Sequence, residues 1–250
     1  MVKELLKHYL RCSGLLMALS VTFTGCLGVT SSHSEPMQDA KLIFYQFEPM
    51  REGEEIAEVS TTEGTFYLRF FPSEAPKAVS NFVTLAQEGF YDGKTVFSIQ
   101  EGIDSDSGDY KSAFLAGASN EAGSKGKTIY HAASFRSEIS KNVWHFPGAV
   151  SAYGTSLGRV DSRFFIVGSH TLDNATIERM KKANFPEEVI EKFKEYGGEP
   201  NYSRLYPVFA QVYEGMDVVE KILNAECDEK GRPASEITIQ SITISFYHIE

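Results

Sequence analysis

Short stretches in which apolar and polar residues alternate are the feature that most limits how this chain can fold. In residues 65–71, Phe66, Leu68 and Phe70 alternate with more polar neighbours, so one face of an extended strand would be apolar. Similar stretches predict further strands at residues 56–59, 95–99, 149–153, 164–167, 208–212 and 236–246. Many short strands separated by turn residues are typical of an antiparallel sheet that packs around one core.

Two other stretches show helical spacing. Pro76 suits a first helical position, and Gly89 suits the position after the last turn. Between them apolar residues recur every three or four positions, and they do so again in residues 216–223. A charged segment with a helical pattern, residues 171–201, lies between two strands. We therefore predict a mainly β fold: a closed antiparallel β-barrel capped by two α-helices, with a helical surface insertion.

The composition fits one domain preceded by a leader and a tether. The chain has 250 residues, of which 42% are hydrophobic. Its formal net charge is −10 and no basic stripe interrupts this acidity, so nucleic acid is not expected as a partner. Asp104, Asp106 and Asp109 lack the ligand order of a calcium loop, and the histidines form no close ligand pair. No metal is therefore expected.

Residues 1–25 have the pattern of a signal peptide. A basic start precedes an apolar run that is shorter than the about 20 residues that a membrane-spanning helix needs. Residues 23–26, Phe-Thr-Gly-Cys, resemble a bacterial lipobox, which implies cleavage before Cys26 and a lipid on its sulfur. Ordinary secretion with an unmodified Cys26 is the alternative. We expect residues 26–52 to be a lipid-anchored tether and N-terminal extension, and residues 53–250 to be a domain on the extracytoplasmic face of the cell membrane.

Five segments resemble one protein family, and they follow one another in that family's order. They are residues 71–95 (FPSEAPKAVSNFVTLAQEGFYDGKT), 126–130 (GKTIY), 148–153 (GAVSAY), 162–168 (SRFFIVG) and 207–222 (PVFAQVYEGMDVVEKI). The chain is similar to the cyclophilin-type peptidyl-prolyl cis-trans isomerases from residue 56 to about residue 244. The resemblance implies a capped antiparallel barrel, an outer groove for proline-containing peptides, and rotation about X–Pro bonds without a cofactor.

The chain departs from the family where the main catalytic donor should stand. Cyclophilins carry an arginine on the strand after the first helix, and a count without gaps puts Ser98 at that position, or Ile99 if the register slips by one. The family's pocket phenylalanine falls at Ala113, or at Phe114 after a shift of one residue. The resemblance therefore implies a divergent active site.

Other groove positions have changed as well. The resemblance places Gly154 at the family's asparagine, Tyr202 at its groove-edge leucine and Tyr206 at its pocket histidine. Phe165 keeps the family's residue. Together with Tyr153, the aromatic side chains among these form a predicted peptide-binding floor, because flat rings pack well against proline. Ordinary barrel core is the alternative for each ring.

Two interpretations of the function follow. In the first, the chain is a weak isomerase that assists the folding of exported proteins, and the Arg163 guanidinium reaches the substrate amide in place of the missing arginine. The alternative for Arg163 is an ion-paired strand residue. In the second, the chain is a catalytically inactive module that binds proline-containing peptides or protein partners at the cell envelope. Both imply proline-containing peptides or unfolded exported proteins as partners, and we expect a monomer.

Overall fold

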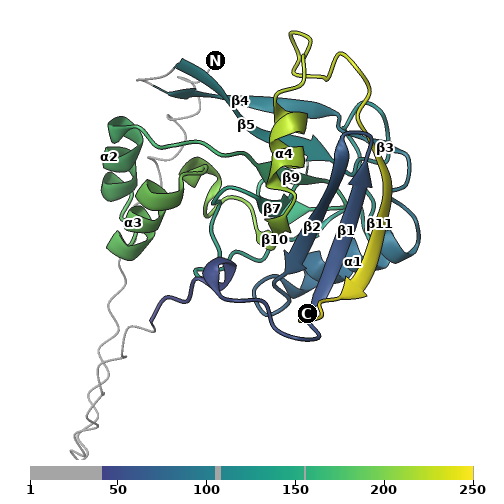
Figure 1. Cartoon of the computed structure of the whole chain (residues 1–250), viewed down its shortest axis with the longest axis horizontal. Helices are drawn as coiled ribbons and strands as arrows, with labels where there is room; N and C mark the ends of the chain where they lie inside the picture. Colours follow the sequence, from purple (N-terminus) through teal and green to yellow (C-terminus); the bar gives the residue numbers. More distant parts are fainter. Residues whose placement is uncertain (1–40, 105–107, 155, 250) are drawn as a thin grey trace, which may run out of the picture. The chain divides into compact units, whose positions relative to one another are not determined.

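The alternating stretches form the strands of one large sheet. The computed structural model describes residues 41–249 apart from 105–107 and 155, without the side chains of 103–108 (Figure 1). The predicted signal peptide, Cys26 and the tether up to residue 40 lie outside the described residues. Among the described residues, no helix combines the length and the apolar character that crossing a membrane requires.

Nine antiparallel strands make up this sheet, in the order β3-β11-β1-β2-β10-β7-β9-β5-β4. They are β1 (Glu55–Thr61), β2 (Gly64–Phe70), β3 (Lys94–Thr95), β4 (Ser98–Asp104), β5 (Gly108–Ala116), β7 (Ala149–Ala152), β9 (Phe164–Val167), β10 (Val208–Glu214) and β11 (Thr238–Phe246). A separate pair joins β6 (Phe135–Arg136) to β8 (Arg159–Val160). The prediction of a mainly β, antiparallel fold is confirmed.

The sheet curls into a half-barrel, and the prediction of a closed barrel is wrong. Strands β3 and β4 are its two edges. The backbone N–H of Val96 donates to Ile237, beside β11, whereas the next N–H, of Phe97, donates to Leu115 on β5. The chain therefore changes partner strand within two residues. In the described residues no ladder of hydrogen bonds joins β3 to β4.

Helices α1 (Pro76–Gln87) and α4 (Met216–Leu223) pack on the sheet. Helix α1 contacts β10 and β11, whereas α4 contacts β2 and β5. Pro76 occupies the first turn of α1, as its missing N–H allows, and Gly89 follows the helix with φ +67°, a conformation that favours glycine. Each helix buries one apolar face in the same core that the sheet surrounds.

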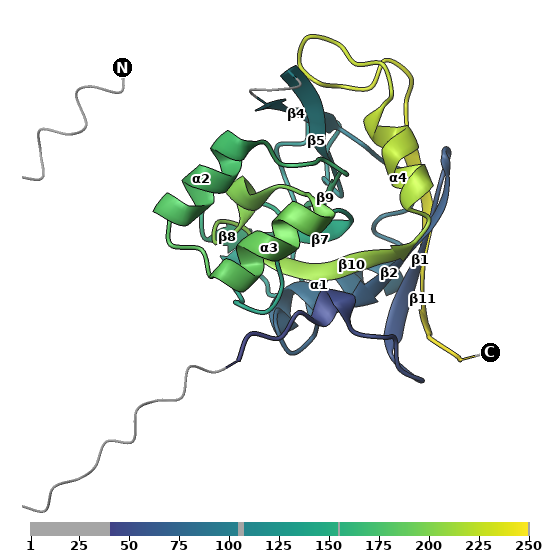
Figure 2. The ribbon, with the colours of Figure 1, turned by 60° about the vertical axis from the view of Figure 1, so that its left-hand side comes forward.

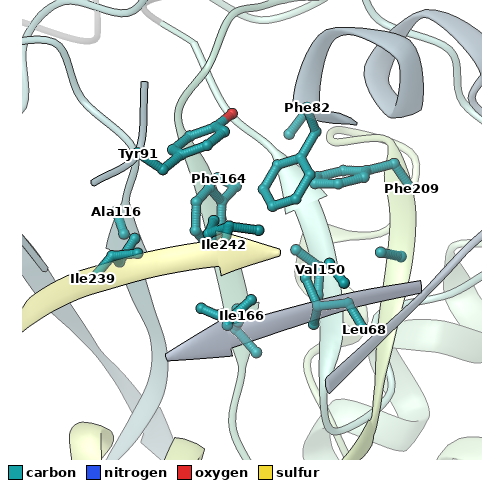
Figure 3. Packing of buried hydrophobic residues seen from close by; sticks show 14 of the residues in the cluster. Leu68, Phe82, Tyr91, Ala116, Val150, Phe164, Ile166, Phe209, Ile239 and Ile242 are labelled. Carbon is teal, nitrogen blue, oxygen red and sulfur yellow. The ribbon is translucent and has the colours of Figure 1, made fainter. Parts of the chain in front are cut away.

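A group of aromatic rings fills this core next to α1 (Figure 3). We call Phe82, Tyr91, Phe164 and Phe209 the inner aromatics. The Phe82 ring centroid lies 5.5 Å from that of Phe164 and 5.2 Å from that of Phe209. Each of the four side chains is at most 2% exposed, so the inner aromatics serve stability and are closed to solvent.

The segment predicted as a helical insertion contains α2 (Asn174–Lys182), α3 (Glu187–Tyr196) and the short 3-10 helix η2 (Pro200–Tyr202). Helices α2 and α3 lie to one side of the sheet, away from β1 and β11 (Figures 1 and 2). A second 3-10 helix, η1 (Tyr45–Phe47), belongs to the N-terminal extension, and the Phe47 ring lies 4.4 Å from that of Tyr196. The extension thus packs against the insertion.

Candidate functional site

A small cavity of about 150 Å³ opens on the outer side of β5 and β9. We call it the groove cavity. Its lining residues are Gln100, Ala113, Leu115, Tyr153, Phe165, Tyr202 and Tyr206. Most of its wall is aromatic, and the polar atoms come from a carboxamide and phenol hydroxyls.

Strand alternation brings two elements of this wall together. Successive side chains of a strand point to opposite faces, so Phe164 enters the core while Phe165 points outward to the groove cavity. Phe165 pairs with Leu115 across β9 and β5, and Leu115 faces the same side. Tyr202 comes from η2, which the helical insertion carries to the edge of the cavity.

The rings of the cavity meet edge to face. We call Tyr153, Phe165, Tyr202 and Tyr206 the groove aromatics. The Phe165 centroid lies 5.1 Å from that of Tyr202 and 5.3 Å from that of Tyr206, at interplanar angles of 65° and 87°. Tyr153 closes the set, 5.9 Å from Tyr206. The sequence predicted all four residues for one floor, and the structure brings them together.

The phenols of Tyr202 and Tyr206 are neutral donors. Burial raises the pKa of Tyr202 and of Tyr206 above the ordinary tyrosine value, so both keep their protons at neutral pH. The Tyr202 hydroxyl lies 3.0 Å from Ser112 Oγ, which fixes its ring at the cavity edge. A ligand in the cavity would therefore meet flat apolar faces and a few hydrogen-bond donors.

A buried histidine supports the aromatic wall from behind. His145 lies between Ser151 Oγ, at 2.8 Å, and Ser203 Oγ, at 3.3 Å, and its ring stacks on Phe165 with centroids 5.7 Å apart. Burial lowers the pKa of His145 to about 3, so the imidazole is neutral at neutral pH. No sequence pattern predicted a role for this residue. His145 links β7 to the turn after Tyr202.

Gln100 and Leu115 line the cavity although no sequence pattern marked either of them. The count without gaps placed Ser98 at the family's arginine position, and Ser98 lies on β4 opposite Leu115. Gln100 lies opposite Ala113, so Ser98 and Gln100 share the face of β4 that looks toward the cavity, but only Gln100 lines it. The Gln100 amide donates to Ser98 Oγ at 2.6 Å. Had the predicted strand been extended beyond residue 99, the alternation of its side chains would have placed Gln100 on the same face as Ser98.

Arg163 lies behind the cavity rather than in it. Its side chain is 2% exposed, and it forms a two-pronged ion pair with Asp161, with Nη2 to Oδ2 at 2.6 Å and Nε to Oδ1 at 2.9 Å. Its Nη1 donates to the Gly123 carbonyl at 2.9 Å. The guanidinium lies 5.2 Å from the centre of the Tyr153 ring. This arrangement matches the ion-paired alternative, because the charged group faces its carboxylate and not the cavity.

Two further predicted residues stand apart from the groove cavity. Phe114 is 2% exposed and belongs to the core cluster, because alternation along β5 sends Ala113 and Leu115 to the groove and Phe114 inward. The side-chain position of Gly154 would lie 2.1 Å from the backbone oxygen of Arg159, so glycine is required there for close packing. Neither residue lines the cavity.

Neither a metal site nor a cationic side chain is found among the described residues of the groove cavity. Within residues 41–249, as far as the structure describes them, no three His, Cys, Asp or Glu side chains gather as a metal site. The residues that line the cavity include neither lysine nor arginine. The chemistry available is apolar packing and neutral hydrogen bonding.

Known proteins match most of the length of this chain. The model of the cyclophilin-type peptidyl-prolyl cis-trans isomerase family matches residues 56–244. A protein of Staphylococcus saprophyticus assigned to the peptidyl-prolyl cis-trans isomerases is 31% identical over 184 residues, which span 74% of this chain and 88% of the relative. A Staphylococcus aureus protein with the same assignment is 28% identical over 195 residues, 78% of this chain and 94% of its own length.

Solved structures share the fold. The crystal structure of a Cryptosporidium parvum cyclophilin-type peptidyl-prolyl cis-trans isomerase covers 77% of this chain and 98% of its own, with a TM-score of 0.57 and 21% identity. A second structure, of that protein in the presence of the dipeptide Ala-Pro, covers 76% and 98% with the same TM-score and 22% identity. The family match extends over most of the chain, and this chain belongs to the cyclophilin-type peptidyl-prolyl cis-trans isomerase family.

Proposed function

We propose that this chain binds X–Pro segments of unfolded exported proteins in the groove cavity and accelerates their cis-trans isomerisation weakly. The observation that carries the proposal is the set of groove aromatics, which offers perpendicular ring faces around a space of about 150 Å³. A proline ring is a compact apolar group, and burying it between such faces is favourable.

Weak rather than strong catalysis is expected because the cavity lacks the family's arginine. The uncatalysed rotation has a barrier of about 18–20 kcal/mol. Removing one preorganised donor typically costs about 10²–10³ in rate. The cavity of this chain offers only neutral donors, since Arg163 is committed to Asp161.

The test is a protease-free isomerisation assay on the full chain. Exchange between the cis and trans forms of the neutral peptide acetyl-Ala-Ala-Pro-Phe-amide is followed by NMR exchange spectroscopy, with an ordinary cyclophilin as the positive control. We expect a rate clearly above that of buffer and about 10²–10³ below that of the control. A rate equal to that of buffer would contradict the isomerase proposal, and intact peptide binding in the same sample would favour the interpretation as an inactive binding module.

We also propose that the chain acts as a monomer anchored by a lipid on Cys26 at the extracytoplasmic face of the membrane. The support is the Phe-Thr-Gly-Cys sequence at the end of a signal-like leader. In the native host, the full chain should partition into the detergent phase and carry the mass of a lipid, whereas Cys26→Ser should lose both. Equal partitioning of the two proteins would contradict the anchor.

A further inference from the structure

We infer that Gln100 is the residue of the groove that hydrogen-bonds the bound peptide, its carboxamide N–H donating to a backbone carbonyl oxygen beside the proline. This inference rests on the proposed function of the groove cavity and names the residue that performs its polar recognition. The residues that line the cavity include no lysine or arginine. The neutral carboxamide of Gln100 is the donor in their place.

The position of Gln100 suits a donor. Its side chain is exposed and lines the cavity, and the residue opposite it on β5 is Ala113, whose small side chain leaves the carboxamide room. A glutamine amide group has two N–H donors. One of them is bonded to Ser98 Oγ at 2.6 Å, and among the described residues the other has no protein partner. Ser98 therefore orients the amide and leaves one N–H for a ligand.

A β-bulge aims this side chain. Gln100 pairs with Ala113 and the next residue, Glu101, pairs with Lys111, so Ser112 is the extra residue on β5. Bulges bend a strand locally and are frequent next to active sites, where they re-aim side chains. Without the extra residue, the two strands would keep one register through this region. The bulge thus lies at the pair that borders the cavity.

Ser112 connects the donor to the aromatic wall. It is 2% exposed, its Oγ donates to the Gln100 carbonyl oxygen at 3.3 Å, and it lies 3.0 Å from the Tyr202 hydroxyl. With the serine proton on the Gln100 carbonyl, the Tyr202 hydroxyl donates to Ser112. The backbone of Gln100 and the ring of Tyr202 are consequently held by one buried hydroxyl. Ser112 is a positioning residue for both.

The chemistry distinguishes Gln100 from Tyr202. The Tyr202 hydroxyl is already engaged with Ser112, so it is a poorer donor for a ligand. A carboxamide N–H is a strong neutral donor, and its net contribution to an interaction in water is about 0.5–1.5 kcal/mol, which corresponds to about a two- to tenfold change in affinity. This magnitude agrees with modest catalysis.

The experiment compares the full chain with Gln100→Ala and Gln100→Glu. The glutamate has the shape of glutamine but donates no hydrogen bond when ionised, and the probe, acetyl-Ala-Ala-Pro-Phe-amide, is uncharged. The matched control is Gln240→Glu, the same change at an exposed glutamine of β11. Peptide affinity and exchange rate are measured by NMR, and circular dichroism checks that each variant is folded.

We expect both Gln100 variants to weaken peptide binding, or to slow exchange, by up to about tenfold, while Gln240→Glu changes neither. In the wild-type chain the side-chain amide resonance of Gln100 should shift when peptide is added, a readout that needs no variant. If the wild-type chain binds the peptide and the Gln100 variants bind it and exchange it equally well, the inference is overturned and the proposed function stands. Absence of peptide binding by the wild-type chain would overturn both.

Discussion

Phe164 and Phe165 are neighbours on β9, yet they belong to two aromatic groups with opposite properties. Phe164 joins the inner aromatics, where the Phe82 ring lies 5.5 Å away in an edge-to-face contact. Phe165 joins the groove aromatics, which pack at similar distances but enclose a cavity. The same residue type thus stabilises the fold on one face of the strand and prepares a binding surface on the other.

The difference between the two groups lies in what completes each of them. The inner aromatics are completed by apolar residues of the sheet and α1, so every ring face is covered. The groove aromatics are completed by polar supports, His145 behind Phe165 and Ser112 beside Tyr202. A wall held by hydrogen bonds keeps its shape when no ligand fills it, which lowers the cost of ordering on binding.

The largest expected effect is on the inner group. Phe164→Ala removes a fully buried ring and should lower the free energy of unfolding by about 3–5 kcal/mol. Urea unfolding measures this, with Phe246→Ala as control, because that ring is 58% exposed and its loss should cost less than about 0.5 kcal/mol. A Phe164→Ala chain as stable as the wild type would contradict the closed core.

The middle effect is on the groove group. Tyr206 is partly exposed, so Tyr206→Ala should weaken binding of acetyl-Ala-Ala-Pro-Phe-amide about tenfold, the equivalent of about 1.4 kcal/mol, and lower stability less than Phe164→Ala does. Tyr206→Phe keeps the ring and should bind within about twofold of the wild type. If Tyr206→Ala bound the peptide as well as the wild type, the aromatic wall would not be the binding surface.

The smallest effect concerns the polar support of the groove. Burial lowers the pKa of His145 to about 3 in the folded chain, whereas an unfolded histidine titrates near 6.5, so the unfolded state binds more protons between these values. Stability is therefore lost as the pH falls below 6.5. Between pH 7 and pH 5.5 the contribution of His145 to this loss should be about 1 kcal/mol.

A His145→Gln variant separates this contribution from those of other groups. Its free energy of unfolding at pH 7 should be lower than that of the wild type, but its decrease between pH 7 and pH 5.5 should be smaller by about 1 kcal/mol. His248→Gln is the control, because that histidine is exposed and lies outside the groove. Equal slopes for His145→Gln and the wild type would show that the imidazole is not kept neutral.

The sequence predicted the strands and the aromatic floor, but it did not predict which residues donate hydrogen bonds in the groove. Family resemblance marked Phe165, and alternation then requires Phe164 to face the core. Alternation gives parity but not register, so the mapping through Ala113 and Phe114 left open which residue faces the groove. The pairing of β5 with β9 decides it, because Leu115 lies opposite Phe165 and faces the groove together with Ala113, and this pairing depends on backbone hydrogen bonds that composition does not reveal.

Two other differences have local causes. Asp161 and Arg163 flank a bend at Ser162, where the Asp161 carboxylate accepts hydrogen bonds from both the backbone N–H and the guanidinium of Arg163, and strand alternation does not predict such a local turn. The open edge of the half-barrel was not visible, because it depends on Val96 and Phe97 bonding to different strands. Patterns of single residues predict elements well and predict the joints between elements poorly.

The most direct test of the account is to map where a proline peptide binds. The full chain is titrated with acetyl-Ala-Ala-Pro-Phe-amide while the aromatic and amide resonances are followed by NMR. We predict that the largest shifts fall on Tyr153, Phe165, Tyr202 and Tyr206, while the resonances of the inner aromatics Phe82 and Phe209 stay in place. Shifts centred instead on the larger polar cavity of about 690 Å³ beside Lys94, Asn120 and Glu236 would contradict the account.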